Sequence, residues 1–391
     1  MPILNRAAEL HDEVTGWRRH LHAMPEILYD VHRTAGFVAD KLKEFGCDEV
    51  VAGIGRTGVV GIIRGNLGAD PGSGPTIGLR ADMDALPLTE ITGKPWASQT
   101  PGRMHACGHD GHTAMLLGAA KYLAETRAFA GAVAVIFQPA EEGGAGGKAM
   151  VEDGLMERFG ISRVFGMHNM PGLPVGHFAI RPGPIMAATA EFTIAVAGKG
   201  GHAAMPHTTI DPLAAASQLV MAFQTVVSRS VDPIDSAVVS VTKFHAGDAY
   251  NVIPQTARLA GTVRTLRNAV AETVFARMRA ICDGIAAAAG VTIDLDIHVN
   301  YPVTDNDAAE AAFAAGVARQ VAGAGNVDAA VLPVMGGEDF SYMLNARPGA
   351  FIFAGNGDTA GLHNPAYDFN DELIPYGISY WVGLAETALG R

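Results

Sequence analysis

A short segment, "MHACGHDGH" at residues 104–112, concentrates side chains that bind metal ions. It holds Cys107 among imidazoles and carboxylates, although the chain has only three cysteines in all. Divalent transition metals favour these ligands, and a Cys-x-His spacing in an extended turn can aim Cys107 and His109 to the same side. A helix predicted just after the segment would favour a negative charge at its N-terminus and help the thiol ionise. The segment predicts a metal site; the alternative is a loop of solvated histidines beside a buried cysteine.

Carboxylates follow two predicted strands. "LRADMDALP" (79–87) places Asp82 and Asp84 after one apolar run, and "FQPAEEGGAGG" (137–147) places Glu141 and Glu142 after another. Ligands of open α/β sheets bind at the carboxyl ends of the strands. Paired acids there can also form a plain solvated turn, but three polar strand ends in succession favour one shared site.

Two isolated histidines are further candidates. His168 lies in "GMHNMP" after an apolar segment, and His363 lies in "GLHNPAYDF". A lone histidine is more often a core or capping residue than a ligand. Both become candidates because a metal site needs more ligands than Cys107, His109 and one glutamate supply.

The elements that would position these residues alternate between helix and strand. Helices are predicted at 34–45 and after residue 112, and short apolar strands at 58–64, 76–80 and 131–138. The end of the chain repeats the pattern, with a helix at 307–322, a strand at 350–355 and a helix from about residue 375. This alternation predicts an α/β domain with a mostly parallel sheet.

The middle of the chain has a different order. Strand, helix, strand, strand, helix and strand are predicted in turn at 191–198, 211–229, 236–244, 257–266, 268–289 and 291–299. This β-α-β-β-α-β order is typical of a ferredoxin-like domain. We therefore expect a discontinuous metal-binding α/β domain at 1–184 and 298–391, interrupted by an inserted domain at 185–297.

Composition excludes several classes of protein. A formal charge of −12 without a basic stripe argues against nucleic-acid binding, and no apolar run approaches the roughly 18–20 residues that span a bilayer. Three scattered cysteines form no disulfide framework, and the N-terminus lacks the apolar core of a signal peptide, so we expect a cytoplasmic protein. "GIGRTG" (53–58) matches a dinucleotide fingerprint, but the strand-like "VVGIIRG" follows it where a helix is required.

Several motifs together resemble the metal-dependent aminoacylase family, whose members include hippurate hydrolases, indole-3-acetyl-amino-acid hydrolases and N-acetyl-diaminopimelate deacetylases. The resemblance runs in order over essentially the whole chain. It implies a mixed-sheet dinuclear metallohydrolase domain with an inserted ferredoxin-like satellite domain. The motifs are "GLRADMDALP", "MHACGHDGH", "QPAEEGGAGGKAMVEDG", "GKGGHAAMPH", "NVIP", "GTVRT", "GGEDF" and "LHNPAYDFND".

The resemblance also assigns roles to residues at the matching positions. It makes Glu141 the general base and Asp84 the acid that orients a metal-binding histidine. In the related carboxypeptidase branch, a histidine stands at the position of Asp82 and no cysteine is a ligand, so the thiol indicates the acyl-amino-acid branch. The implied ligands of two metal ions are Cys107, His109, Glu142, His168 and His363.

Three residues of the inserted domain are implied to act on the substrate. His202 of "GKGGHAAMPH" would reach the active site of a partner subunit and support the oxyanion, which implies a homodimer or a dimer-based oligomer. Asn251 of "NVIP" and Arg264 of "GTVRT" resemble groups that hold the substrate carboxylate. Their alternative readings are a loop cap and an exposed strand end.

We therefore expect an amidohydrolase that cleaves N-acyl-L-amino acids, with a hippurate-like aromatic acyl group as the first substrate. N-acetyl-amino-acid deacetylation and hydrolysis of indole-acetyl-type conjugates are alternatives within the class, and a peptidase of longer chains is a third. A non-enzymatic protein with a structural metal site is the alternative outside it, but such sites are closed and hold no spare base. Manganese or zinc is expected, with cobalt or nickel as further candidates.

Overall fold

The computed structural model describes residues 3–68, 70 and 72–390, which fold into two compact units. The larger unit contains residues 1–185, 305–332 and 339–391, and the inserted unit contains 186–304 and 333–338. The inserted unit thus extends beyond the expected residue 297, because its last strand continues to Tyr301. It also includes a distant segment, in which the Gly336 carbonyl accepts a hydrogen bond from the Ala187 amide.

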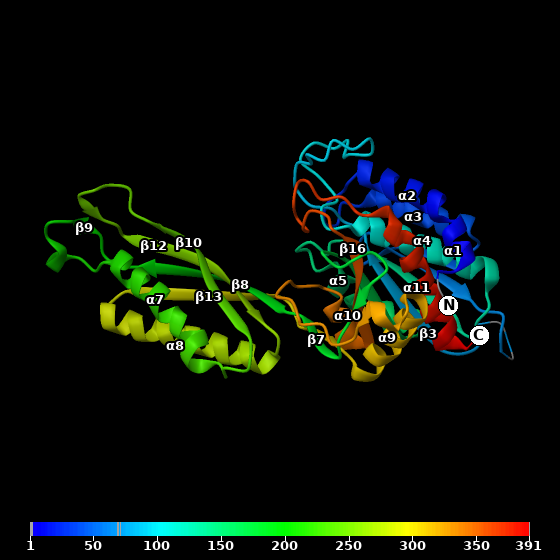
Figure 1. Cartoon of the computed structure of the whole chain (residues 1–391). Helices are drawn as coiled ribbons and strands as arrows, with labels where there is room; N and C mark the ends of the chain where they lie inside the picture. The colour runs from blue at the N-terminus through cyan, green and yellow to red at the C-terminus, as the bar shows by residue number, and fades with distance from the viewer. Residues whose placement is uncertain (1–2, 69, 71, 391) are drawn as a thin grey trace. The chain divides into compact units, whose positions relative to one another are not determined.

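The larger unit is built on an eight-stranded mixed sheet (Figure 1). Its four middle strands are parallel and its flanking strands β1, β2 and β6 pair antiparallel with their inner neighbours, which confirms the expected mixed α/β fold. Nearly every residue of the middle strands is buried, as their continuous apolar runs predict. In sheet order the strands are β1 (Glu49–Ile54), β2 (Gly58–Arg64), β4 (Ala132–Gln138), β3 (Thr76–Asp82), β5 (Ile161–Pro171), β16 (Gly349–Gly357), β6 (Phe178–Ala179) and β15 (Val327–Asp328).

Helices cover both faces of this sheet. The chain passes from β3 to β4 in one direction and from β4 to β5 in the other, so right-handed crossovers place the connecting helices on opposite faces. One face carries α3 (His32–Glu44), α4 (His109–Thr126), α9 (Ala308–Ala322) and α11 (Ile374–Leu389), with α1 (Asn5–Glu9) and α2 (His11–Ala23) packed outside them. The other carries α5 (Gly146–Glu152), α6 (Leu155–Arg158) and α10 (Ser341–Ala346).

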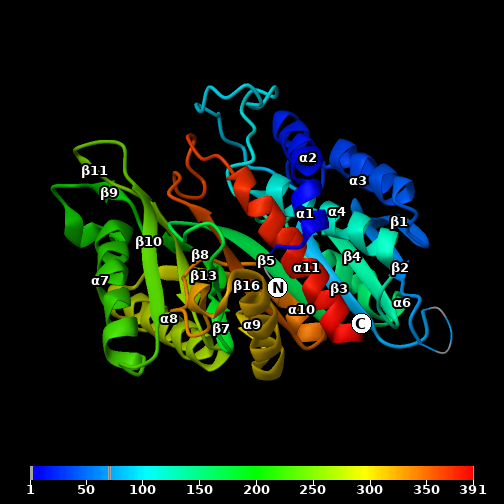
Figure 2. The same cartoon turned by 45° about the vertical axis from the view of Figure 1, so that its right-hand side comes forward.

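Helices α4 and α11 pack closely against each other (Figure 2). A Cβ on Gly377 of α11 would lie 2.1 Å from the Met115 sulfur of α4, and a Cβ on Gly118 would lie 2.6 Å from Ile378. The two glycines therefore let the helices approach, and this contact fixes α4, whose first residue is His109, against the core.

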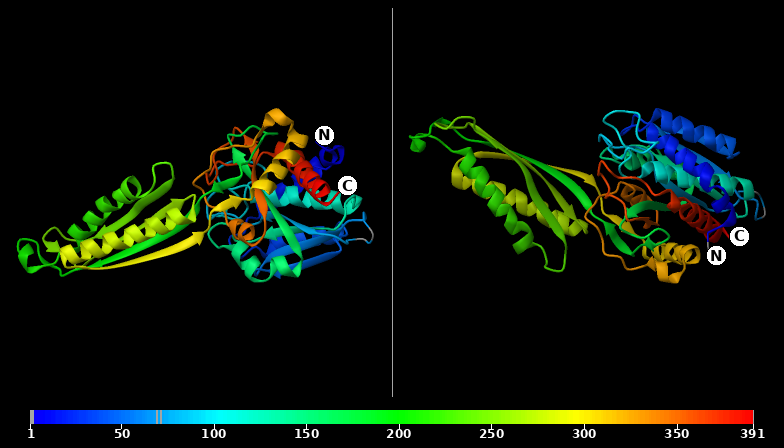
Figure 3. Two further views of the ribbon diagram at one scale, coloured as in Figure 1. Left: turned by 90° about the horizontal axis from the view of Figure 1, so that it is seen from below. Right: turned by 45° about the horizontal axis from the view of Figure 1, so that its top comes forward.

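The inserted unit is a four-stranded antiparallel sheet with both helices on one face (Figures 1 and 3). Its sheet order is β10-β12-β8-β13, and its β-α-β-β-α-β sequence confirms the expected ferredoxin-like arrangement. Buried and exposed residues alternate along β8 because only one face is covered. The elements are β8 (Ala188–Ala197), α7 (Pro212–Ser230), β10 (Ala237–Ala246), β12 (Thr256–Thr265), α8 (Asn268–Ala289) and β13 (Thr292–Tyr301).

Short elements complete the fold. Strands β9 (Gly201–His202) and β11 (Val252–Ile253) pair with each other, as do β7 (Gly183–Met186) and β14 (Thr304–Asn306). The "GIGRTG" segment forms the connection between strands β1 and β2, which confirms that no helix follows it. Among the described residues, no helix is long and apolar enough to cross a membrane.

Candidate metal centre

The candidate ligands meet at the carboxyl edge of the four parallel strands. Asp84 follows β3, Glu141 and Glu142 follow β4, and His168 lies near the end of β5. His363 follows β16, and its amide donates to the Ala106 carbonyl at 2.7 Å, which ties it to the cysteine segment. Parallel strands all end at the same edge, so four distant segments of sequence converge there.

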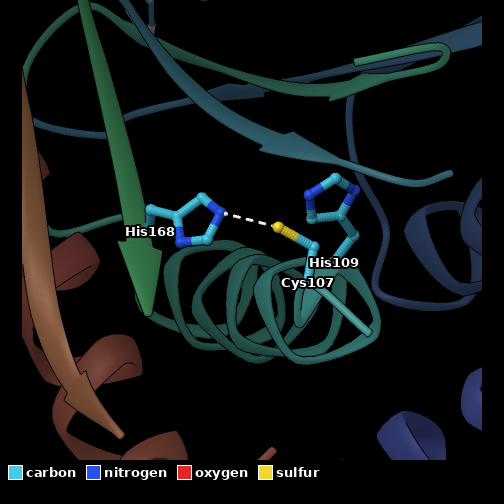
Figure 4. A group of neighbouring side chains, drawn as sticks. All are labelled: Cys107, His109 and His168. Atoms are coloured by element: carbon cyan, nitrogen blue, oxygen red, sulfur yellow. Dashed lines mark hydrogen bonds between the residues drawn. The ribbon is translucent and has the colours of Figure 1, made fainter. Parts of the chain in front are cut away.

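The five residues implied as ligands form two clusters that share Cys107. One cluster contains Cys107, His109 and His168, and the other contains Cys107, Glu142 and His363; within each, the donor atoms lie within 4.8 Å of one another. The Cys107 sulfur points toward His168, 3.3 Å from its Nε2 atom (Figure 4). A thiolate placed between two such clusters can contact an ion in each of them.

Hydrogen bonds fix the tautomers of two histidines. Nδ1 of His109 lies 2.8 Å from the Asp84 carbonyl oxygen, and Nδ1 of His168 lies 2.6 Å from the Asn169 carbonyl oxygen. Because a carbonyl oxygen only accepts, each Nδ1 carries the proton and each Nε2 keeps its lone pair for another partner. The buried Nε2 of His109 has no hydrogen-bond partner among the described residues. These inward lone pairs fit a transition-metal cation.

Local charges also favour cations at this site. Burial raises the pKa of the Cys107 thiol, and the carboxylates of Glu142, Glu141 and Asp82 raise it further. The expectation that a helix N-terminus helps this thiol ionise is therefore wrong for the protein groups alone, because nearby full charges outweigh the partial charge of the helix. Only a bound cation would reverse the balance and stabilise the thiolate.

Asp84 holds two segments together rather than one histidine. Its carboxylate accepts the backbone N–H groups of Glu141 at 2.8 Å and Glu142 at 3.1 Å. Its contact with His109 is made through its main-chain carbonyl, whereas the nearest carboxylate oxygen is 3.7 Å from Nδ1. Asp84 thus orients the histidine with its backbone and positions both glutamates with its side chain.

A buried polar network lies behind the ligands. The Asp82 carboxylate accepts from Arg80 at 2.8 Å and lies 2.7 Å from Nδ1 of His112. Burial opposes ionisation of Asp82, but the charges of His109, Arg80 and His112 outweigh it and hold its pKa well below the usual value. Arg80 also donates to Asp339 at 3.0 Å, so this network ties strand β3 to the start of α10.

Two residues that the sequence did not single out, Asn169 and Tyr367, support the ligand segments. The Asn169 carboxamide lies 2.7 Å from Nε2 of His112 and 2.5 Å from the Tyr367 hydroxyl. Gly108 has φ +99°, and a Cβ there would lie 2.3 Å from the Asn169 side chain. A glycine between the two ligands of the "CGH" turn is therefore required. The signal in the sequence was that Asn169 directly follows His168.

The inserted unit carries the remaining candidates at opposite ends of its sheet. His202 of β9 pairs with Val252 of β11, and the Asn251 carbonyl accepts from the Ala203 amide at 3.0 Å, so His202 and Asn251 are neighbours. Arg264 lies near the far end of β12, where it pairs with Thr189. At about 3.3 Å per residue, it is roughly 25 Å from the start of that strand, next to which Asn251 lies.

The fold and the donor set together define a dinuclear metallohydrolase class of protein. Residues 78–387 match the family described as peptidase family M20/M25/M40. The chain belongs to this family and is a hydrolase that acts on amide bonds, which confirms the resemblance seen in the sequence.

Three similar proteins have names that bear on this assignment. A hippurate hydrolase of Campylobacter jejuni is 44% identical over 386 residues, which cover 98% of this chain and 99% of that protein. An N-acetyl-L-cysteine deacetylase of Bacillus subtilis is 42% identical over 93% of this chain and 85% of its own. A crystal structure of a Bacillus subtilis dinuclear metal-binding peptidase of family M20 superposes with a TM-score of 0.85 at 34% identity, covering 98% of this chain and 99% of that one.

Proposed function

We propose that this protein hydrolyses N-acyl-L-amino acids to a carboxylic acid and a free amino acid, with a hippurate-like aromatic acyl group as its first substrate. The observation that carries the proposal is the pair of donor clusters that share Cys107, with Glu141 beside them. The names of the similar proteins support cleavage of N-acyl amino acids as the reaction.

Two divalent cations would be held by the two clusters. Cys107, His109 and His168 would bind one ion, and Cys107, Glu142 and His363 the other. Bound ions lower the pKa of a coordinated water toward neutrality and polarise an amide carbonyl. The thiolate and imidazoles favour zinc, whereas the carboxylate also suits manganese; cobalt and nickel remain candidates.

Glu141 is the proposed general base. Its backbone is fixed by Asp84 at 2.8 Å, and its carboxylate approaches Nε2 of His109 to 4.0 Å. A carboxylate held there can accept a proton from the attacking water and return it to the nitrogen of the departing amino acid. Being 7% exposed, it is shielded from bulk solvent, which favours a directed transfer.

His202 is the proposed donor to the oxyanion. Its Nδ1 atom accepts the backbone N–H of Ala204 at 3.1 Å, so in the neutral ring Nε2 carries the proton. His202 is exposed and can present this N–H to developing negative charge on the amide oxygen. Asn251, its neighbour, and Arg264 would bind the substrate carboxylate.

We further propose that one substrate is bound by residues of two subunits. His202 and Asn251 lie at one end of the sheet of the inserted unit and Arg264 lies near the other, roughly 25 Å away. A small substrate cannot span that distance within a single inserted unit. A homodimer in which His202 and Asn251 act on the partner's site would resolve this, and the inserted unit would then serve dimerisation.

The test is release of glycine from hippurate by the purified protein, first stripped of metal with a chelator and then given manganese or zinc. Metal-dependent release that Glu141→Gln lowers by about 10³-fold or more would support the proposal. Release from N-acetyl amino acids or indole-acetyl conjugates but not from hippurate would keep the reaction and replace the substrate. Bound metal with no activity on any of these substrates would contradict the proposal and favour a structural metal site.

A further inference from the structure

The segment at residues 25–30 is anchored beside the metal centre by hydrogen bonds on both sides. The Glu26 carbonyl accepts from the amide of Ala85, which follows Asp84, at 2.7 Å. The Tyr29 hydroxyl donates at 2.7 Å to the carbonyl of Gly144, two residues after Glu142. Leu28 is therefore held between the two segments that carry the acids of the site.

Leu28 adopts a backbone conformation that a leucine rarely takes. Its φ angle is +52°, in the left-handed region where a side chain with a Cβ costs conformational free energy. Its side chain is 40% exposed, so burial in the core does not compensate that cost fully. Strained backbone of this kind persists only where the surroundings enforce it, and it concentrates at functional sites.

The surroundings of Leu28 do enforce its conformation. The Glu26 carboxylate accepts the Thr34 amide at 2.8 Å at the start of α3, and the Thr57 hydroxyl donates to the Tyr29 carbonyl at 3.0 Å. The Arg56 guanidinium lies 4.1 Å above the centre of the Tyr29 ring. The leucine side chain is thus presented to solvent from a rigid frame rather than from a mobile loop.

A second exposed leucine of the same unit provides a contrast. Leu67 is also 40% exposed, but its amide bonds to the Phe129 carbonyl at 3.1 Å, just before strand β4 begins. It therefore lies at the amino edge of the sheet, away from the metal centre, and it is not among the residues with positive φ. Exposure alone does not distinguish Leu28; its strain and its position do.

We propose that Leu28 is a specificity-determining residue whose side chain contacts the acyl group of the substrate. An apolar side chain displayed next to the acids of the site favours acyl groups that are apolar and larger than acetyl, since each buried methylene adds to binding. This inference rests on the proposed function and extends it by naming the class of acyl group.

The experiment compares kcat/KM for benzoylglycine and for acetylglycine in Leu28→Gly, Leu28→Asn and the control Leu67→Asn. Glycine and asparagine tolerate positive φ, so the melting temperature of both Leu28 variants should be unchanged or a few degrees higher. We expect kcat/KM for benzoylglycine to fall about 10-fold, with that for acetylglycine changed less than about 2-fold. The Leu67 variant should leave the ratio of the two unchanged.

Equal loss on both substrates, or no loss on either, would overturn the assignment of Leu28 while leaving the reaction intact. A fall in melting temperature together with equal loss would identify Leu28 as a structural residue only. Wild-type protein that hydrolyses neither substrate would overturn the proposed function itself, so the two failures are distinguishable.

Discussion

At the scale of the residue, the partner of one ring nitrogen decides what a histidine can do with the other. His109 and His168 donate through Nδ1 to backbone carbonyls, which leaves Nε2 free for a metal. His112 lies between Asp82 and Asn169, with both ring nitrogens engaged, so it supports the ligands rather than joining them. Burial lowers the pKa of His105 to about 3, which keeps that ring neutral. Four histidines of one small region thus have different roles.

The support that Asn169 gives to the ligands can be tested by Asn169→Ala. The change leaves the His112 ring and the buried Tyr367 hydroxyl without this partner, which should lower the free energy of unfolding by about 1–3 kcal/mol. Loss of an outer hydrogen bond to a metal site should also weaken zinc binding about 10–100-fold. Thermal unfolding of the metal-free protein and competition with a chelator measure the two effects.

Asn326→Ala is the matched control, because the Asn326 amide bonds only to the Ala322 carbonyl at an exposed helix end. It should change stability by less than about 0.5 kcal/mol and leave metal affinity unaltered. Unchanged zinc affinity in Asn169→Ala would show that this amide does not position the ligands.

At the scale of the element, helix α4 is positioned by a buried ion pair as well as by packing. His22 of α2 lies 2.8 Å from the carboxylate of Asp110, in the first turn of α4, and 3.3 Å from Glu90. Burial alone would lower the pKa of His22, but the Asp110 and Glu90 carboxylates outweigh it and raise the pKa to about 9. The same turn carries His109, so this pair fixes the end of the helix that faces the metals.

The raised pKa of His22 predicts a pH-dependent contribution to stability. A group whose pKa rises on folding stabilises the native state fully below its unfolded pKa of about 6.5, and the contribution is lost as the pH rises toward 9. His22→Gln should therefore cost at most about 3 kcal/mol near pH 5.5 and close to none of that near pH 9.5. Urea unfolding of both proteins across this range measures the difference.

His20→Gln is the control for removing an imidazole from the same helix, where His20 packs against Phe37. A stability loss in His22→Gln that stays constant from pH 5.5 to 9.5 would refute the charged pair with Asp110.

At the scale of the whole molecule, the length of one sheet separates residues that must meet at one substrate. Strand β12 runs from Thr256, near the Asn251 loop, to Thr265, beside Arg264. A ten-residue strand is a rigid spacer, so loop motion cannot bring its two ends together. Assembly of two chains is the physical route that remains.

Subunit complementation tests this assembly. His202→Ala and Glu141→Gln should each be nearly inactive, yet a mixed dimer would contain one site with an intact Glu141 and the partner's intact His202. After co-refolding equal amounts, activity should recover to about a quarter of the wild-type value, because half of the dimers are mixed and each has one intact site. Light scattering should report a dimer. No recovery from a demonstrated mixed dimer would place His202 in its own subunit's site.

Much of this architecture could be predicted from the sequence because it depends on local pattern. Helix α8 and strand β2 occupy the residues expected from their periodicity, since burial of one face or of a whole strand leaves a repeating signature. The Cys-x-His segment and the strand-end acids likewise indicated a metal site, because their side-chain chemistry is specific. The reading of Asp84 was less complete, because it could not distinguish a side-chain contact from a main-chain one.

Only the tertiary structure decided which distant groups are neighbours. The sequence alone could not pair Asn169 with Tyr367, or Tyr29 with Gly144, because such contacts depend on how strands and loops are ordered across a sheet. Nor could it show that Arg264 lies far along a strand from Asn251 while His202 lies beside it. Composition and periodicity set what each segment can form; the distances that select roles arise when those segments pack.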